Sequence, residues 1–233
     1  MHNAVKAAAR DGRRVRGIHL TFPSTNAIEV LATVGLDFVY LDGEHGAFGQ
    51  REVELCCLAA ERHGLTTIAR VPDRSVATMT SFLDRGVLSL VVPHVDSVDD
   101  AQEAVAAAYY APLGSRSFGG GRPHYGLGIT DRPAHLATAN AQTGLCIMIE
   151  SRGALESAHE IARLEGIDYL SFGMNDLAQS LGHPGGPDHP EVLAAVRDAT
   201  SRINAAGKPV REDFMRYAWV NDVLVAGARH FLN

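Results

Sequence analysis

The sequence predicts an α/β fold: a single (β/α)₈ TIM barrel spanning residues 1–233. The chain of 233 residues is close to the usual size of one such barrel. Short runs rich in β-branched residues alternate with longer helical stretches from end to end. The interiors of these runs are continuously apolar, as expected for parallel strands that are covered on both faces.

The expected elements follow this alternation in order. The first residues predict a short amphipathic helix, and further helices are expected at 49–63, 98–109, 152–163 and 189–205. Residues 111–143 form a long connection, which in a compact domain is usually functional or disordered. The strands are expected at 15–22, 38–45, 66–71, 88–95, 144–151 and 167–173, with weaker candidates at 208–212 (KPVRE) and 229–233 (RHFLN).

An open doubly wound sheet has the same alternation of strands and helices, but the first turn lacks the G-x-G-x-x-G of dinucleotide-binding sheets.

The formal charge of −6 argues against a nucleic-acid partner, because phosphate binding requires clustered Lys and Arg. No apolar run approaches the ~20 residues of a membrane span. The first residues also lack the apolar stretch of a signal peptide, so a cytoplasmic protein without a membrane partner is expected.

Polar residues cluster where the expected strands end, which is where barrel enzymes build their sites. The second strand ends in Asp42-Gly43-Glu44-His45, and the third ends in Arg70. The fifth ends in Glu150, and the sixth runs into Asn175-Asp176. The carboxyl ends of the strands are therefore the expected place of the functional site.

Glu150 and Asp176 each follow a very apolar run. A carboxylate buried near a core is costly unless it is paired or coordinates a cation. Two carboxylates with water and a chelating substrate suit Mg²⁺, Mn²⁺ or a similar ion. The alternative is that Glu150 pairs with an arginine and Asp176 caps the helix NDLAQSLG, and the residues alone leave both interpretations open.

His45, at a strand end, suits a general base or a metal ligand, or equally a hydrogen-bonded structural histidine. Arg70 needs an anion, which a substrate carboxylate or a neighbouring glutamate would supply. Asp84 is a surface residue by default. Lysine occurs only at Lys6 and Lys208, and neither is expected at the carboxyl ends of the strands. A Schiff-base mechanism is therefore excluded, so a carbon–carbon lyase on this chain should be metal-dependent.

Several motifs together resemble the HpcH/HpaI family of class II pyruvate aldolases. They are LDFVYLDGEHG, TIARVP, FLDRGVLSLVVPHVDSVDDAQEAV, PLGSRS, MIESRGALE, SFGMNDLAQSLG and HPEV, in register from about residue 5 to residue 206. The resemblance implies a (β/α)₈ barrel with a divalent metal, Mg²⁺, Mn²⁺ or Co²⁺, held by Glu150 and Asp176. It also implies that the enzyme makes or cleaves a carbon–carbon bond between a pyruvate-type 2-oxo acid and an aldehyde.

The resemblance also assigns roles to other residues. Arg70 falls on the arginine that contacts the 2-oxo oxygen, His45 on the proposed acid–base residue, and Asp84 on its orienting carboxylate. Backbone amides of the turn from Gly173 through Asn175 to Asp176 would hold the pyruvate carboxylate. Whether His45 or a water on the metal is the base stays open. For the acceptor pocket there are four unranked candidates: Arg16, His19, Arg122 and Tyr125.

The carboxyl end departs from the family pattern. After Gly207 the seventh strand is compressed, and the sequence ends at Asn233, where the eighth is expected. The fold is therefore expected to lack the terminal helix that in relatives packs on a neighbouring subunit, although a homo-oligomer remains the expectation. Two other functions stay open: a related decarboxylase or an enzyme coupling the enolate to another acceptor, and a non-catalytic barrel that acts as a binding protein.

Overall fold

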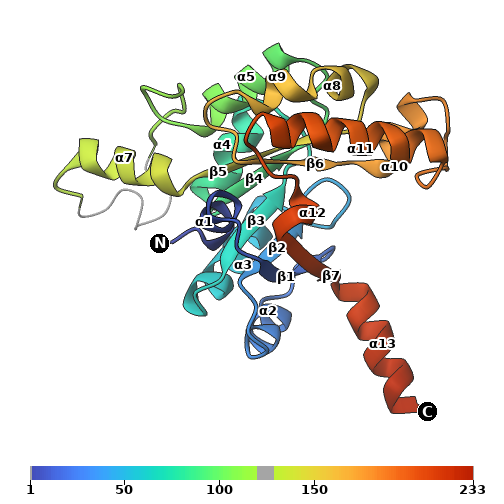
Figure 1. Ribbon diagram of the computed structural model, residues 1–233. Coiled ribbons are helices and arrows are strands. Elements are labelled where there is room, and N and C mark those ends of the chain that lie inside the picture. The colour runs from blue at the N-terminus through green and yellow to red at the C-terminus, as the bar shows by residue number, and fades with distance from the viewer. Residues whose placement is uncertain (1, 120–128, 233) are drawn as a thin grey trace.

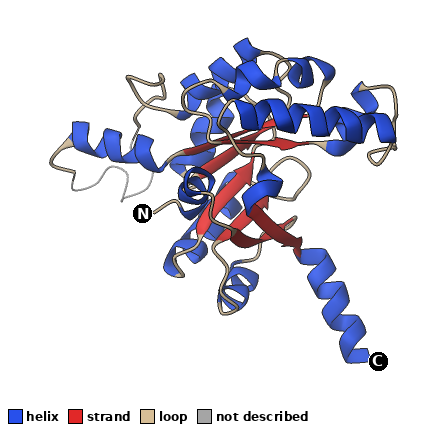
Figure 2. Cartoon of the chain, in the orientation of Figure 1, coloured by secondary structure: helices blue, strands red, loops and turns tan. Residues whose placement is uncertain are grey.

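The computed structural model describes residues 2–119 and 129–232. Within them, a parallel sheet of seven strands forms a half-barrel in the order β6-β5-β4-β3-β2-β1-β7, so neighbouring strands mostly follow one another in the sequence (Figures 1 and 2). The strands are β1 (Val15–Leu20), β2 (Phe38–Asp42), β3 (Thr66–Arg70), β4 (Ser89–Val92), β5 (Gly144–Ile149), β6 (Tyr169–Phe172) and β7 (Met215–Trp219).

Helices connect the strands, as the sequence predicts for an α/β fold. The expected helix at 152–163 is divided in two at Ser157, and the connection at 111–143 ends in a helix. The described helices are α1 (Ala4–Asp11), α2 (Thr25–Ala32), α3 (Gln50–Arg62), α4 (Val76–Asp84), α5 (Val98–Ala108), α7 (Arg132–Gln142), α8 (Arg152–Glu156), α9 (Ala158–Ala162), α10 (Met174–Ser180), α11 (Pro190–Ala205), α12 (Arg211–Phe214) and α13 (Val220–Leu232).

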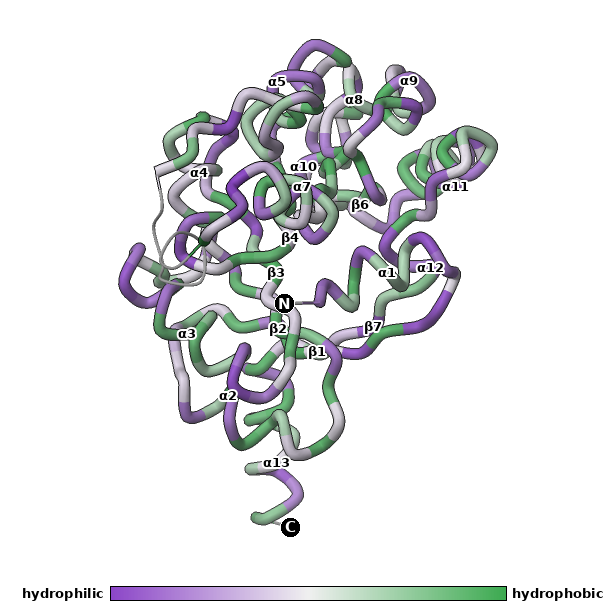
Figure 3. Tube along the Cα trace, turned by 90° about the vertical axis from the view of Figure 1, so that its left-hand side faces the viewer, coloured by the Kyte–Doolittle hydropathy of each residue, from purple (hydrophilic) through white to green (hydrophobic). Residues whose placement is uncertain are grey.

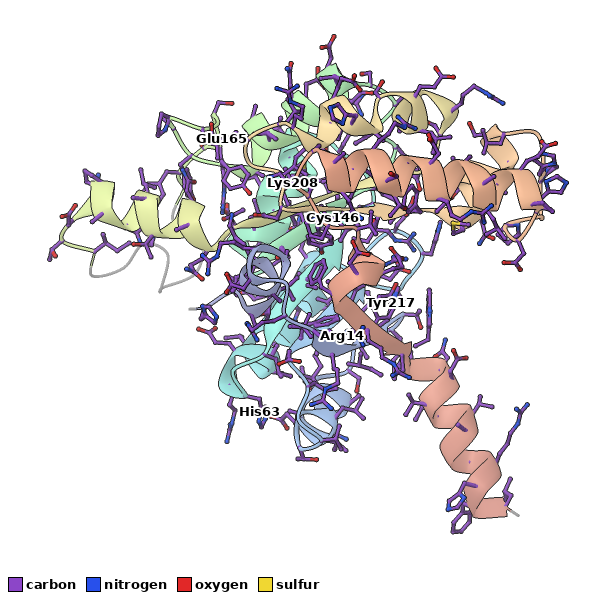
Figure 4. The ribbon with its side chains drawn as sticks, viewed as in Figure 1. Arg14, His63, Cys146, Glu165, Lys208 and Tyr217 are labelled. Atoms are coloured by element: carbon purple, nitrogen blue, oxygen red, sulfur yellow. The ribbon has the colours of Figure 1, made fainter. Side chains whose placement is uncertain are left out.

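Two apolar clusters lie on the two faces of the sheet. The larger one lies between the strands and the surrounding helices. The smaller one lines the concave face and includes Phe38, Tyr40, Cys146 and Tyr169 (Cys146 is labelled in Figure 4). Helix α1 adds apolar side chains such as Val5 to the concave cluster. Burial on both faces explains why the strand sequences are continuously apolar rather than alternating.

The carboxyl-terminal part corrects the sequence analysis. The expected strand at 208–212 is reduced to one isolated bridge between Leu170 and Val210. The strand expected at 229–233 is wrong, because residues 229–232 belong to α13, whose Ala, Leu and Arg residues favour a helix. The segment that pairs with β1 is instead β7, which starts only five residues after Val210. The terminal helix that was expected to be missing is therefore present.

Helix α13 lies apart from the rest of the molecule, beyond β7 and α2 (Figures 1 and 3). Only Val220, its first residue, is buried, and Val223, Leu224, Val225, Phe231 and Leu232 are exposed. Arg216 and Ala218 are also exposed, on the outer side of β7, so this edge of the sheet has no helix covering it within the described residues. None of the described helices is long and apolar enough to cross a membrane.

Candidate active site

The site is built on the carboxyl ends of adjacent parallel strands. Asp42 ends β2 and Arg70 ends β3, and the strand register pairs them directly. The Arg70 guanidinium donates from Nε to Asp42 Oδ1 at 3.0 Å and from Nη2 to Oδ2 at 2.7 Å. Asp42 Oδ1 also accepts the backbone N–H of His45 at 3.1 Å. This two-pronged ion pair fixes both the guanidinium plane and the start of the loop after β2.

Burial opposes ionisation of Asp42, but hydrogen bonds with His19 and Arg70 outweigh it, so the pKa of Asp42 lies below its ordinary value. Burial likewise disfavours the charged form of Arg70, and its hydrogen bond to Asp42 outweighs burial, so the pKa of Arg70 is raised. Both groups are therefore charged at neutral pH. Nη1 of Arg70 also lies 3.1 Å from Glu44 Oε2, which adds a second carboxylate to this guanidinium.

His94, just after β4, connects this pair to Glu150. Its Nε2 lies 2.8 Å from Glu44 Oε1, and its Nδ1 lies 3.3 Å from Glu150 Oε1. Its backbone N–H donates to the same Glu150 oxygen at 2.6 Å. The backbone of His94 has φ 56°, a left-handed conformation that is uncommon for a residue other than glycine. His94 was not predicted from the sequence, although its position at a strand end is the same signal that identified the other residues.

Glu150 follows β5 and is only 6% exposed. Burial raises its pKa, the His94 contacts lower it, and the negative charges of Glu44 and Asp176 raise it further. Gly173, at the end of β6, leaves room for this carboxylate: a Cβ there would lie 2.5 Å from Glu150 Oε2. A side chain at position 173 would therefore displace Glu150.

Asp176 lies in the first turn of α10, which begins directly after Gly173 without a side-chain cap. Asn175 and Asp176 are exposed. In the part of the chain that the structure describes, the Asp176 carboxylate has no hydrogen bond or ion pair, so the helix-capping alternative is not what the structure contains. Glu150 and Asp176 supply oxygen ligands whose mutual repulsion a divalent cation would relieve, so these residues fit a hard metal ion.

A different set of possible metal ligands lies in the connection after α10 and in the first turn of α11. His183, His189 and Glu191 have ligand atoms within 4.8 Å of one another. The rings of His183 and His189 stack at 3.7 Å, and His183 Nε2 lies 2.9 Å from Glu191 Oε2. This group was not predicted from the sequence, and it lies outside the strand ends that carry the candidate site.

His45 and Asp84, expected to act together, have other polar partners among the described residues. The His45 side chain is 66% exposed, and its Nε2 lies 3.9 Å from Glu44 Oε2. Asp84 instead accepts a hydrogen bond of 2.7 Å from Nη2 of Arg116, which follows α5. No hydrogen bond joins His45 to Asp84 within the described residues.

Both lysines lie at the opposite ends of the strands. Lys6 Nζ donates to Thr143 O at 2.6 Å, just before β5, and Lys208 Nζ donates to Ile167 O at 2.6 Å, just before β6. Neither amine is therefore available at the carboxyl ends, as expected from the sequence.

Of the acceptor-pocket candidates, Arg122 and Tyr125 lie outside the described residues.

The chain is similar to known proteins over most of its length. The chain is 36% identical over 233 residues to the 4-hydroxy-2-oxovalerate aldolase of Rhodococcus jostii, covering 96% of this chain and 88% of that protein. It is 35% identical over 207 residues to the hydroxypyruvate/pyruvate aldolase of Sagittula stellata, covering 89% and 81%.

Among solved structures, an HpcH/HpaI aldolase/citrate lyase family protein from Burkholderia cenocepacia superposes with a TM-score of 0.89 at 29% identity, covering 99% of this chain and 98% of that chain. Residues 17–223 match the family described as HpcH/HpaI aldolase/citrate lyase. The matched segment runs from β1 into α13, so it contains every strand that contributes to the site. The chain therefore belongs to the HpcH/HpaI aldolase/citrate lyase family.

Proposed function

We propose that this chain is a divalent-metal-dependent carbon–carbon lyase, an aldolase that joins or separates pyruvate and an aldehyde. The observation that carries the proposal is the continuous series of contacts from Arg70 through Glu44 and His94 to Glu150. This series places a fixed cation and a buried carboxylate on the same rim. An enolate needs positive charge at the oxygen where negative charge develops.

Glu150 and Asp176 would hold the metal ion, Mg²⁺, Mn²⁺ or Co²⁺, and the bound ion would act as a Lewis acid toward the 2-oxo acid. Asp42 and Glu44 keep the Arg70 guanidinium aimed at the 2-oxo oxygen, where it stabilises the enolate. The carboxylate of the substrate would be held by backbone amides of the turn from Gly173 to Asp176. The Gly173 amide donates to Ile149 O at 3.1 Å, so the amides that follow it, which no side chain caps, would make the contact.

His45 is the proposed base, with Nε2 taking up the proton of the aldol hydroxyl during cleavage. Its exposed imidazole is free to approach a substrate bound above Arg70. Asp84 is proposed as the carboxylate that orients His45. For this role, either the hydrogen bond between Asp84 and Arg116 must rearrange, or Asp84 must act on the His45 of a neighbouring copy.

For the fold, we propose a complete (β/α)₈ barrel whose seventh position is Val210 and whose eighth position is β7. The isolated bridge from Val210 to Leu170 and the pairing of β7 with β1 support it. We also propose a homo-oligomer in which α13 packs against a second copy. Its exposed Val223, Leu224 and Val225 would be covered by that contact.

The test is oxaloacetate decarboxylation and pyruvate C3 proton exchange, because both report the enolate step without the unknown aldehyde. Wild type should be active with Mg²⁺, Mn²⁺ or Co²⁺ and inactive with EDTA, and Glu150→Ala should lose the activity. The matched control is Glu165→Ala, since Glu165 is exposed on the outer side of the molecule (Figure 4) and should leave both rates unchanged. A folded wild type inactive with every metal would overturn the proposal.

A further inference from the structure

Trp219 occupies an unusual position at the carboxyl end of β7. The register of β7 on β1 places it beside His19, and the two rings stack at 3.9 Å with 19° between their planes. Although His19 covers one face of its indole, Trp219 is 41% exposed. A tryptophan that only filled the core would be buried, so a large part of this ring is open to a ligand.

His19 connects Trp219 to the candidate site. Its Nε2 lies 3.4 Å from Asp42 Oδ2, and Asp42 is the carboxylate that holds Arg70. His19 is only 3% exposed, and its Nδ1 has no hydrogen-bond partner among the described residues. A buried polar group without a partner is costly, and a ligand beside it would supply one.

Further aromatic side chains pack against His19. Tyr217, two residues earlier on β7, lies 5.5 Å from the His19 ring and stacks on Tyr40 at 5.7 Å. Trp219, His19 and Tyr217 therefore form an aromatic wall on β7 and β1, which we call the β7 wall. Three strand spacings, roughly 14 Å, separate β7 from β3, and Arg70 lies two residues beyond the β3 position in register with Trp219. His19, which contacts both Trp219 and Asp42, bridges this distance.

We propose that the β7 wall is the binding surface for the acceptor aldehyde and that it selects aldehydes with a flat aromatic or conjugated group. Such a group would stack on the open part of the Trp219 indole while its carbonyl carbon meets the enolate near Arg70. The inference rests on the proposed aldolase function and names its second substrate. It selects His19 from the acceptor-pocket candidates and adds Trp219, which the sequence analysis did not consider.

Trp219 is the only tryptophan in the chain, so its fluorescence reports on this wall alone. Benzaldehyde should quench wild-type fluorescence saturably, beyond its effect on free N-acetyltryptophanamide. Cyclohexanecarbaldehyde, of similar size but not flat, should quench much less. A linear, non-saturating response identical to that of the free indole would overturn the inference, whatever the catalytic activity.

The kinetic test is aldol addition of pyruvate to each aldehyde. Trp219→Ala should raise the KM for benzaldehyde about tenfold, with a much smaller change in the KM for pyruvate. Trp219→Phe should restore most of the benzaldehyde affinity, and Leu58→Ala, an exposed position on α3, is the control. If decarboxylation is metal-dependent but Trp219→Ala binds benzaldehyde as wild type does, the β7 wall is not the acceptor site. If wild type lacks decarboxylation, the proposed function fails, and the fluorescence titration still decides on the wall.

Discussion

His94 holds the Glu150 carboxylate by two contacts, a backbone N–H bond of 2.6 Å and an imidazole Nδ1 at 3.3 Å, both to Oε1. The opposite ring nitrogen of the same imidazole lies 2.8 Å from Glu44, which in turn contacts Arg70. One histidine thus joins the arginine side of the site to the proposed metal side. The left-handed backbone at His94 aims both its amide and its ring at these carboxylates.

His94→Ala should weaken binding of Mn²⁺ by roughly 10–100-fold, the usual effect of removing a group that orients a metal ligand. Without the imidazole, Glu150 keeps only the backbone bond and Glu44 loses a partner. Isothermal titration with Mn²⁺ measures the change. His94→Gly is the companion variant, because glycine adopts the left-handed conformation freely and should be more stable than the alanine variant by about 1 kcal/mol. Unchanged Mn²⁺ affinity in both would contradict the role given to the ring.

Asp42→Asn should lower the free energy of unfolding at neutral pH by about 3 kcal/mol, because it removes the buried carboxylate that makes two hydrogen bonds to Arg70 and leaves only Glu44 beside the guanidinium. The folded pKa of Asp42 lies below the ordinary value of about 3.9. The unfolded chain therefore holds more protons between these two values, so stability from Asp42 is full above about pH 4 and is lost as the pH falls.

Urea unfolding of wild type and Asp42→Asn, from neutral pH to below pH 4, tests whether the stability contributed by Asp42 falls as the pH falls. The difference between the two proteins should be largest at neutral pH and should shrink as the pH falls below about 4, since only wild type carries the titrating group. A difference that stays constant down to the folded pKa would mean that Asp42 stabilises the fold by its shape or hydrogen bonds and not by its charge.

The sequence was sufficient to locate the first six strands, because a strand buried on both faces leaves a continuous apolar run. It also located Arg70, Glu150 and Asp176, since polar residues directly after such runs gather on one rim. His94 has the same signal but follows Pro93 as a single uncharged histidine, and only the backbone conformation shows that it faces Glu150.

The segment after Gly207 could not be predicted from local pattern. A strand reduced to the single bridge at Val210 depends on its pairing with β6 and leaves no periodicity to detect. The last residues, RHFLN, are too short to distinguish helix from strand until α13 is seen as a whole. Trp219 could not be predicted as a site residue either, because its position beside His19 depends on the pairing of β7 with β1, which the local sequence does not reveal.

Leu224→Asp should dissociate the proposed oligomer. Leu224 is 57% exposed in the single chain, and covering α13 with a second copy would bury it, where a carboxylate without a partner is costly. Size-exclusion chromatography with light scattering measures the mass. Val30→Asp on α2 is the control, since Val30 is 60% exposed but lies on a different helix. Equal masses for wild type and Leu224→Asp would rule out a contact centred on this residue.

Gly173→Ala should abolish the metal-dependent enolate chemistry while the chain remains folded. The new Cβ would lie 2.5 Å from Glu150 Oε2 and 2.8 Å from Glu150 Cβ, closer than such atoms approach, so the carboxylate must leave its place. Decarboxylation of oxaloacetate measures the activity, and titration with Mn²⁺ separates loss of the metal from loss of the later step. Both signals should fall together, because the atom displaced is a proposed metal ligand.

The matched control is Gly227→Ala, the same change at a position where a Cβ meets nothing within 4 Å. Because Gly227 lies inside α13, alanine should favour the helix by about 1 kcal/mol and leave the enolate step untouched. Comparing the two glycine-to-alanine variants distinguishes an effect of the added methyl group in general from an effect of its position beside Glu150. If Gly173→Ala binds Mn²⁺ as wild type does, Glu150 does not hold the metal in the position that Gly173 leaves open. The role of that glycine would then be limited to the turn into α10.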